Sequence, residues 1–328
     1  MEWNDSGKLL HGQCCFCYRS GGPDVIQKQE SNAVYSMNDC IKQLEATGDY
    51  RIIKRFIPVE SYCVPGDAAK RIGIFLDTET TGLDVDTDEI IELAMVPFEF
   101  DAAGNIYRLL PEYNGLNDPG MPIPDIARQI TGITDEMVKG QSIDVAAVKK
   151  LLSGAAIVIA HNARFDRPFC EALLDEFKDI SWACSIADVN WQEEGIEGVK
   201  LEFLAYKFGF FFEGHRATID CQAGIEILSR SLPQSGEPVL KRLLEHARRT
   251  EVRLWAKGAP FEKKDDLKKR GYRWSSGEKG KRKAWYKDLQ EDELEDELLY
   301  LNTHIYPRNV AELPMDRFTA MLRYSDRI

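Results

Sequence analysis

The sequence predicts a three-layer α/β/α fold around a mixed five-stranded sheet, with a small α+β module toward the C-terminus. Apolar runs of strand length, joined by a hairpin connection, are followed by alternating strand and helix patterns. The chain of 328 residues is long enough to bury at least one sizeable core. Beyond the main domain the composition becomes locally basic, which indicates a separate element.

Composition favours a globular protein and excludes several classes. Hydrophobic residues make up 44% of the chain, and no run approaches the ~18 consecutive apolar residues of a membrane span. The N-terminus lacks the basic flank and apolar core of a secretion signal. The eight cysteines are scattered, and Cys170, Cys184 and Cys221 lie in apolar runs, so reduced thiols are expected. We therefore expect a cytoplasmic protein with no membrane partner.

Residues 1–35 are predicted to form a loose N-terminal extension. They carry little periodicity, and Ser20-Gly-Gly-Pro23 interrupts them. Four potential zinc ligands occur in this stretch: His11, Cys14, Cys15 and Cys17. Their spacing is crowded and no second Cys-x-x-Cys follows, so we favour unpaired thiols over a zinc site.

Residues 36–70 are predicted to form a helix-strand element. Ser36 is a suitable N-cap for a helix over residues 37–46, and Thr47-Gly48-Asp49 is suited to end it. Residues 50–59 alternate as a strand does. This strand is basic, and we favour a solvated face packed beside the main domain over a contact to DNA.

The main domain is expected over residues 71–231. Its strands are predicted at residues 72–76, 89–100, 105–110, 155–160 and 182–189. Residues 101–104 have a suitable length for the hairpin between the second and third strands. Helices are predicted around residues 124–129, 142–152 and 167–177, with a further helix after His215.

Two acidic residues follow the first buried strand. Asp77 and Glu79 are two positions apart, so on a strand they share one face at roughly 6.6 Å, while Thr78 points away. Burial of unpaired carboxylates costs several kcal/mol, so this pair must be protonated, reach water or hold cations such as Mg²⁺. Alone, an Asp-x-Glu pair is more simply an ordinary turn after a strand.

Two later motifs add candidates to this pair. His161-Asn-Ala-Arg-Phe-Asp166 follows an apolar strand, and Asp166 lies where a loop is expected to enter a helix, at the carboxyl ends of parallel strands. A helix cap is the alternative for Asp166 alone. In His215-Arg-Ala-Thr-Ile-Asp220, the two end residues are about 140° apart around a helix. We therefore expect His215 on the entering loop, from which both side chains can converge.

Together these motifs resemble the DnaQ-like 3′-5′ exonucleases of the DEDDh group, in the DEDD superfamily. The three motifs occur in order over about residues 72–231, with Thr131-Gly-Ile-Thr134 between the first two. The resemblance implies a ribonuclease H-like fold and a magnesium-dependent nuclease that releases 5′-nucleoside monophosphates from a 3′ end.

The resemblance also implies a role for each motif residue. Asp77, Glu79 and Asp220, with Asp166 directly or through water, would hold two Mg²⁺ or Mn²⁺ ions. His215 would accept the proton of the attacking water. The substrate-binding candidates are Thr80, Gly82, Leu83, His161 and Asn162, with Leu83 against the terminal base. For His161 and Asn162, hydrogen bonds that fix the loop are the favoured alternative.

The C-terminal part is predicted in three pieces. Residues 232–252 are typical of a linker and an amphipathic helix, residues 253–290 of a basic α+β module, and residues 291–328 of an acidic helical tail. Residues 241–287 hold seventeen Lys and Arg against six Asp and Glu, a net charge of +11 in a chain of −12. Such a local excess is typical of nucleic-acid binding.

Within the module the candidate nucleic-acid contacts are Lys279, Lys281, Arg282, Lys283 and Trp285. A solvated basic turn is the alternative for the lysines. Of Trp255, Trp274 and Trp285, we expect at least two in the core of the module, because the module is small.

The expected partner is nucleic acid, with single-stranded DNA 3′ ends preferred and roles in DNA repair or replication. An exoribonuclease is an alternative, because the same catalytic residues serve both sugars. A polymerase III epsilon-like proofreading subunit with a polymerase partner is another. A nuclease fold that only binds nucleic acid would lack an acid or the histidine, and none is lacking here.

Overall fold

The computed structural model describes residues 36–328, except for residues 65, 215 and 308–311 and the side chain of Lys279. The chain divides into two compact units, residues 1–54 and 55–328. His11, Cys14, Cys15 and Cys17 lie outside the described residues. No helix in the described ranges is long and apolar enough to cross a membrane.

In the first unit, the predicted N-terminal helix is confirmed. Helix α1 (Met37–Ala46) begins after Ser36, whose hydroxyl accepts from Asp39 N–H at 3.2 Å, while the Asp39 carboxylate accepts from Ser36 N–H at 3.2 Å. This reciprocal pair is a capping box. The strand predicted over residues 50–59 is wrong in extent, because only β1 (Lys54–Arg55) has strand pairing. Both residues of β1 are exposed, so no buried face extends the strand.

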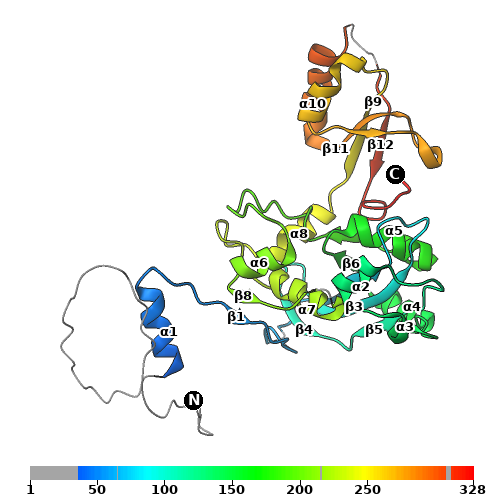
Figure 1. Ribbon diagram of the computed structural model, residues 1–328. Helices are drawn as coiled ribbons and strands as arrows, with labels where there is room; N and C mark the ends of the chain where they lie inside the picture. The colour runs from blue at the N-terminus through cyan, green and yellow to red at the C-terminus, as the bar shows by residue number, and fades with distance from the viewer. Residues whose placement is uncertain (1–35, 65, 215, 308–311) are drawn as a thin grey trace, which may run out of the picture. The chain divides into compact units, whose positions relative to one another are not determined.

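The second unit is built on a mixed sheet (Figure 1). Its strands are β2 (Arg71–Thr80), β3 (Ile90–Phe100), β4 (Ile106–Leu109), β5 (Tyr113–Leu116), β6 (Ile157–Ala160) and β7 (Trp182–Cys184). The order is β4-β3-β2-β6-β7, with β2 antiparallel to β3 and parallel to β6. The sheet has six strands rather than the predicted five. The additional strand, β5, pairs with β3 over Glu92–Met95, beyond the end of β4.

Helices cover both faces of this sheet, which confirms the three-layer arrangement. Phe75 points to a core that it shares with α6 (Leu201–Lys207), α7 (Ala217–Leu228) and α8 (Val239–Ala247). Its neighbours Ile74 and Leu76 point to the opposite core, shared with α4 (Val145–Gly154) and α5 (Ala163–Leu173). The alternation follows from the two-residue period of a strand.

Several predicted boundaries shift. Helix α5 begins at Ala163, not at residue 167, and a 3₁₀ turn at Asp175–Asp179 replaces its predicted end. Strand β7 ends at Cys184, because the Asp188 carboxylate accepts from Cys184 N–H (2.8 Å) and turns the chain. The remaining short elements are α2 (Asp125–Thr131), α3 (Asp135–Val138) and β8 (Phe210–Phe211).

The helix expected in the linker region belongs to the core of the main domain. Val239, Leu240, Leu243, Leu244 and Ala247 of α8 are all buried in the core that contains Phe75. The amphipathic pattern therefore marks a helix that packs on the sheet, and the connection before it is short.

The C-terminal module has its own four-stranded antiparallel sheet and its own core. The sheet order is β10-β11-β9-β12, and a cluster that includes Val252, Leu254, Leu267, Leu289 and Leu301 fills the interior. Its elements are β9 (Glu251–Ala256), α9 (Lys264–Lys269), β10 (Arg273–Ser275), β11 (Ala284–Gln290), α10 (Leu294–Tyr300) and β12 (Met315–Phe318), with one-turn segments at Phe261–Lys263, Glu278–Gly280, Glu291–Glu293 and Leu301–Ile305.

The acidic helical tail predicted for residues 291–328 is only partly helical. Helix α10 is present, but Met315–Phe318 pairs with β9 and completes the sheet of the module. The last residues then return to the main domain, where Ala320 O accepts from Trp182 N–H at 2.9 Å.

Arg167 on α5 holds this C-terminal segment. The Arg167 side chain is fully buried and donates to the carbonyl groups of Ala320 (3.1 Å), Met321 (2.7 Å) and Arg323 (2.6 Å). Arg323 in turn pairs with Glu251 at the start of β9 (2.8 Å). The C-terminal segment thus ties the module to the helix that carries Asp166.

Candidate active site

Asp77 and Glu79 lie near the C-terminal end of β2, on the face of the strand that packs against α7. They are two and four positions after Phe75, so their side chains point to the same face of β2 as the Phe75 ring. Phe75 contacts α7 at Gly224. A Cβ at Gly224 would lie 2.2 Å from Phe75 Cζ, so glycine is needed for this close approach. Asp220 precedes Gly224 by four residues and so lies on the same face of α7. The packing of α7 on β2 therefore brings three acids together.

The three carboxylates form a group that could hold a metal ion. One oxygen from each of Asp77, Glu79 and Asp220 lies within 4.8 Å of the other two. Arg216 N–H donates to Asp220 Oδ2 at 3.0 Å and orients that side chain. Hard carboxylate oxygens at this separation are the donor set that Mg²⁺ and Mn²⁺ prefer.

Asp166 reaches the same place from the opposite layer. It lies in the first turn of α5, and its Oδ1 accepts from both Thr78 N–H (3.1 Å) and Thr78 Oγ1 (2.8 Å). Thr78 points away from Asp77 and Glu79, as predicted, and thereby holds Asp166 behind the strand end. Asp166 is outside the group of three convergent carboxylates, although it lines the same cleft.

Burial and mutual repulsion make this cluster costly to ionise. Burial raises the pKa of Asp77 well above its ordinary value, and Asp166, Asp220 and Glu79 raise it further. Burial, followed by Asp220, raises the pKa of Glu79 to about 8. A divalent cation would relieve both effects, because it favours the ionised form of every carboxylate. The residues present therefore fit a divalent metal.

The cleft above the cluster has a volume of about 560 Å³ and also contains His161. His161 Nδ1 is 2.8 Å from Ser185 Oγ, and burial lowers the pKa of the imidazole to about 4. Burial thus favours the neutral imidazole, which can donate or accept a hydrogen bond. Lys200 and Glu202 also line this cleft.

The other substrate-binding candidates differ in how exposed their side chains are. Thr80 is buried and its Oγ1 donates to Gly82 O at 2.5 Å, so it braces the turn. Leu83 is 86% exposed and lines an adjacent cavity. Asn162 is exposed, with a left-handed backbone (φ 81°) at the start of α5. Leu83 and Asn162 are therefore accessible to a ligand, whereas Thr80 acts on the shape of the turn.

His215 lies outside the described residues, so its role as a base stays a prediction. The described residues on either side of it are close to the cluster. A Cβ at Gly214 would lie 3.4 Å from Asp220 Oδ1, and Arg216 donates to Asp220 as described above.

Glu92 on β3 is a further acid beside the site. It is 1% exposed and lies opposite Glu79 in the β2–β3 register. Its Oε1 accepts from Asn114 Nδ2 (2.9 Å) and lies 3.6 Å from Arg216 Nη2. The sequence alone does not predict that Glu92 lies beside the site, because the strand register that places it opposite Glu79 is set in the folded hairpin.

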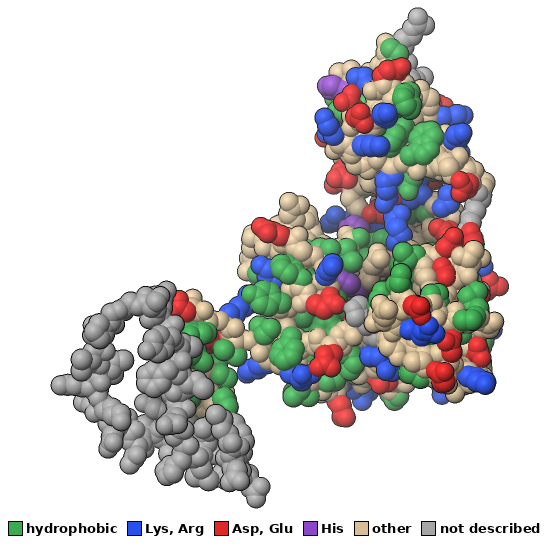
Figure 2. Space-filling view, viewed as in Figure 1, with side chains coloured by type: hydrophobic (Ala, Val, Ile, Leu, Met, Phe, Trp, Pro, Cys, Tyr) green, Lys and Arg blue, Asp and Glu red, His purple; other side chains and the backbone are tan. Residues whose placement is uncertain are grey.

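In the C-terminal module, much of the basic charge is paired internally. Arg253 and Arg273 pair with Asp288, and Arg270 and Lys287 pair with the buried Glu297. Lys and Arg side chains are mixed with Asp and Glu over this part of the surface (Figure 2). The acidic run that follows residue 290 is thus partly an internal counterpart of the basic stretch.

The predicted contact residues of the module differ in availability. Arg282 pairs with Asp316 (3.2 Å), Lys281 lies 3.8 Å from Asp326, and Lys283 is exposed. Trp285 is half-buried against the core and Trp255 is 3% exposed, while Trp274 is 51% exposed. Two of the three tryptophans are therefore in or against the core, as predicted. The Lys279 side chain is outside the described part of the chain.

Comparisons with known proteins agree with this geometry. The exonuclease family RNase_T matches residues 74–228. DNA polymerase III PolC-type of Listeria welshimeri is 34% identical over 154 residues, which are 45% of this chain and 10% of that protein. The PolC-type polymerase of Thermotoga maritima is 29% identical over 163 residues, 48% of this chain and 12% of that protein. The chain spans about a tenth of the length of these curated relatives.

Two solved structures are also similar. Exonuclease X in complex with 5′ overhanging duplex DNA is 24% identical and covers 53% of this chain and 99% of its own, with a TM-score of 0.39. E. coli Exonuclease I in complex with a 5cy-dA13 oligonucleotide is 15% identical and covers 67% of this chain and 63% of its own, with a TM-score of 0.47. Residues 74–228 thus match the RNase_T exonuclease family and carry Asp77, Glu79, Asp166 and Asp220 in that order.

Proposed function

We propose that this chain is a metal-dependent 3′-5′ exonuclease that hydrolyses DNA from its 3′ end and releases 5′-nucleoside monophosphates. The observation that carries the proposal is the convergence of Asp77, Glu79 and Asp220 within 4.8 Å at the base of an open cleft. This arrangement occurs inside a domain of an exonuclease family.

The proposed roles follow from the position of each side chain. Asp77, Glu79 and Asp220 would hold two Mg²⁺ or Mn²⁺ ions, with Asp166 completing the set directly or through water. When bound, the two ions supply a hydroxide nucleophile near neutral pH and neutralise charge on the phosphate and the leaving 3′ oxygen. The three carboxylates must be ionised to do this, so metal binding releases protons from the site.

The remaining residues handle the proton and the nucleotide. His215 accepts the proton of the attacking water, because an imidazole titrates near neutral pH. Leu83 packs against the terminal base, and the accessible Asn162 contacts the terminal nucleotide. His161, neutral and buried at the cleft wall, offers a hydrogen bond without charge.

DNA is the preferred substrate because the curated relatives are DNA polymerases of the PolC type. Their matched segment is only part of a polymerase, which also favours a second candidate: a proofreading subunit that acts with a polymerase partner. Purified chain that removes a mispaired 3′ end much faster when polymerase is added would support that candidate.

The direct test is degradation of one sequence as 5′-labelled single-stranded DNA, duplex DNA and RNA, with Mg²⁺ or EDTA. A 3′-5′ exonuclease shortens the labelled strand in single-nucleotide steps, and only with the metal. Asp77→Ala should lower the rate by at least about 10³-fold, because a lost metal ion removes several kcal/mol of transition-state stabilisation.

The matched control is Glu89→Ala, which removes an exposed carboxylate just before β3. It should degrade the substrate at the rate of the unsubstituted protein. Equal rates for Asp77→Ala and Glu89→Ala would show that the acid cluster is not the catalytic site. Faster degradation of RNA than of DNA would replace the DNA assignment with an exoribonuclease.

A further inference from the structure

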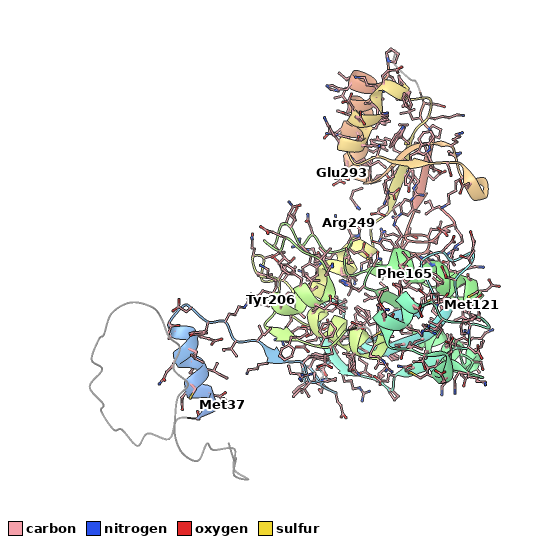
Figure 3. The ribbon with its side chains drawn as sticks, viewed as in Figure 1. Met37, Met121, Phe165, Tyr206, Arg249 and Glu293 are labelled. Carbon is pink, nitrogen blue, oxygen red and sulfur yellow. The ribbon has the colours of Figure 1, made fainter. Side chains whose placement is uncertain are left out.

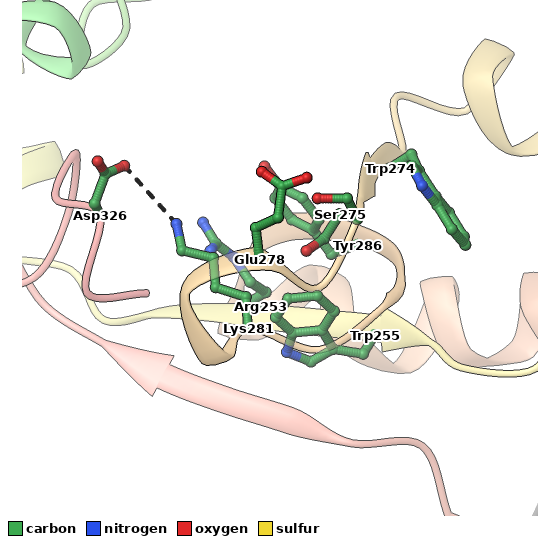
Figure 4. A pocket seen from close by; sticks show the side chains of 9 residues that line it. Arg253, Trp255, Trp274, Ser275, Glu278, Lys281, Tyr286 and Asp326 are labelled. Carbon is green, nitrogen blue, oxygen red and sulfur yellow. Dashed lines mark ion pairs between the residues drawn. The ribbon is translucent and has the colours of Figure 1, made fainter. Parts of the chain in front are cut away.

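Three cavities follow one another along the second unit and are joined by shared residues. The catalytic cleft and a second cavity of about 390 Å³ share Phe165, which lies on α5 (Figure 3). The second cavity and a third of about 280 Å³ share Asp326 near the C-terminus. The third cavity lies in the C-terminal module (Figure 4). A chain-like ligand that leaves the catalytic cleft past Phe165 can therefore continue into the module.

The third cavity is lined by aromatic and basic side chains, the kinds that bind nucleotides in other proteins. Trp274, Trp255 and Tyr286 line it together with Lys281 and Arg253. Trp274 is 51% exposed, and its ring is braced by Trp285 with the ring centres 5.5 Å apart. An exposed, braced indole offers a flat surface on which a base of any identity can stack.

The middle cavity has a cation and an exposed apolar side chain along the same line. Arg164 lines it and is exposed on α5, and Leu83 stands beside it with 86% of its surface exposed. Arg164 is available to a phosphate, and Leu83 is the residue proposed above to meet the terminal base. Leu83 thus marks the terminal base, and Arg164 suits a phosphate just behind a 3′ end held in the cleft.

The C-terminal segment that follows the module is anchored to α5, and this anchor holds the module beside the second cavity. Arg167 donates to three carbonyl groups of residues 320–323, and Arg327 pairs with Glu171 at 2.8 Å. Asp326, which lies between these two anchors in the sequence, lines both cavities. The junction of the path is thus built from the Arg327–Glu171 ion pair and the hydrogen bonds of Arg167 to main-chain carbonyl groups.

We propose that the Trp274 cavity is a second binding site for the same nucleic-acid strand whose 3′ end occupies the catalytic cleft. This inference rests on the proposed function and adds an upstream subsite to it. The occupant is a single strand, because stacking on Trp274 requires an unpaired base.

Charge at the junction changes when the strand binds. In the free protein Lys281 lies 3.8 Å from Asp326, shown as the dashed pair in Figure 4. In the second and third cavities the lining acids are Asp84, Glu278 and Asp326, and the lining cations are Arg164, Lys281 and Arg253. Arg253 is already paired with Asp288, so Arg164 and Lys281 are the two cations that can turn to phosphates. We therefore expect a phosphate to replace Asp326 beside Lys281.

The test uses the full chain and single-stranded DNA of 3, 6, 12 and 24 nucleotides with Mg²⁺. For the unsubstituted protein, KM should fall as the strand grows long enough to reach Trp274, with kcat nearly constant. Trp274→Ala should raise KM for the 24-mer by about 5- to 150-fold, the range for the loss of one stacked base, and leave trinucleotide hydrolysis unchanged. Lys281→Glu should act in the same direction and reduce the dependence of KM on salt.

Two controls come from the same module. Phe261→Ala removes a side chain that is 74% exposed, and Lys268→Glu reverses an exposed lysine; neither residue lines any of the three cavities. Both should keep the dependence of KM on length. If Trp274→Ala and Lys281→Glu behave like these controls, the second binding site is refuted, although trinucleotide hydrolysis would still support the exonuclease.

Binding measured without turnover separates the two proposals. The Kd of a fluorescent 24-mer, measured in EDTA, should rise for Trp274→Ala by a similar factor even if no variant hydrolyses DNA. Absence of hydrolysis by the unsubstituted protein would refute the proposed function, and an unchanged Kd would refute the second site.

Discussion

Replacement of Glu79 by glutamine should stabilise the metal-free protein at high pH. The pKa of Glu79 is raised from 4.5 to about 8 in the folded state, by burial first and Asp220 second. A carboxyl with a raised pKa binds its proton more tightly when folded, so it contributes most to stability below pH 4.5. That contribution is lost as the pH rises to about 8, while Glu79→Gln has no proton to lose.

The size of the effect follows from the width of this pH window. One pH unit corresponds to about 1.36 kcal/mol, so a window of about 3.5 units sets an upper limit of about 4.8 kcal/mol. Glu79 is partly exposed and shares the site with other acids, so solvent screening reduces this limit. We expect Glu79→Gln to gain ~1–3 kcal/mol over the unsubstituted protein between pH 5 and pH 9.

The assay is urea unfolding in EDTA at pH 5 and pH 9, with Glu89→Gln as the control. Glu89 is an exposed glutamate one residue before β3, so its substitution should give the same small change at both pH values. Saturating Mg²⁺ should remove the advantage of Glu79→Gln, because the metal stabilises only the ionised site. An equal effect of Glu79→Gln at both pH values would show that the pKa of Glu79 is not raised by burial and by Asp220.

Three other substitutions test separate parts of the account. His215→Ala should lower kcat by roughly 10²–10⁴ with little change in metal affinity, and a collapse of Mn²⁺ binding in titration would make His215 a ligand instead. Gly224→Ala places a Cβ 2.2 Å from Phe75 Cζ, so the free energy of unfolding in urea should fall by ~1–3 kcal/mol. Metal binding should also weaken, because α7 carries Asp220 and must move. An unchanged urea midpoint would mean that α7 packs differently. Arg167→Met removes the hydrogen bonds that Arg167 donates to three carbonyl groups and to Glu171 and should cost ~3–5 kcal/mol. A loss below ~1 kcal/mol would show that the C-terminal segment is not held by this side chain.

The sequence predicts the centre of the fold and most of the acid cluster because local rules apply there. The two-residue period of β2 places Asp77 and Glu79 on one face and Thr78 on the other, as the structure shows. The helical spacing of the third motif places Asp220 toward β2, since Gly224 one turn later contacts Phe75.

Other elements depend on contacts that local rules do not reveal. Strand β5 has the sequence Tyr-Asn-Gly-Leu and is half-exposed, so it has no apolar run, and only its pairing with β3 makes it a strand. Glu92 becomes part of the site through the register of a folded hairpin. The strand Met315–Phe318 pairs with residues 251–254, and the Arg167 anchor joins residues that are 153 positions apart. Periodicity gives no information about such distant pairs.

The central claim is that metal ions held by Asp77, Glu79 and Asp220 contact the phosphate that is hydrolysed. The most direct measurement is the release of the 3′-terminal nucleotide from DNA whose last linkage carries sulfur in place of one non-bridging oxygen, in Mg²⁺ and in Mn²⁺. Because Mn²⁺ accepts sulfur ligands better than Mg²⁺, sulfur should slow the Mg²⁺ reaction by at least about tenfold and Mn²⁺ should restore it for the stereoisomer that faces the metal. An identical sulfur effect in both metals for both stereoisomers, or hydrolysis that continues in EDTA, would contradict the claim.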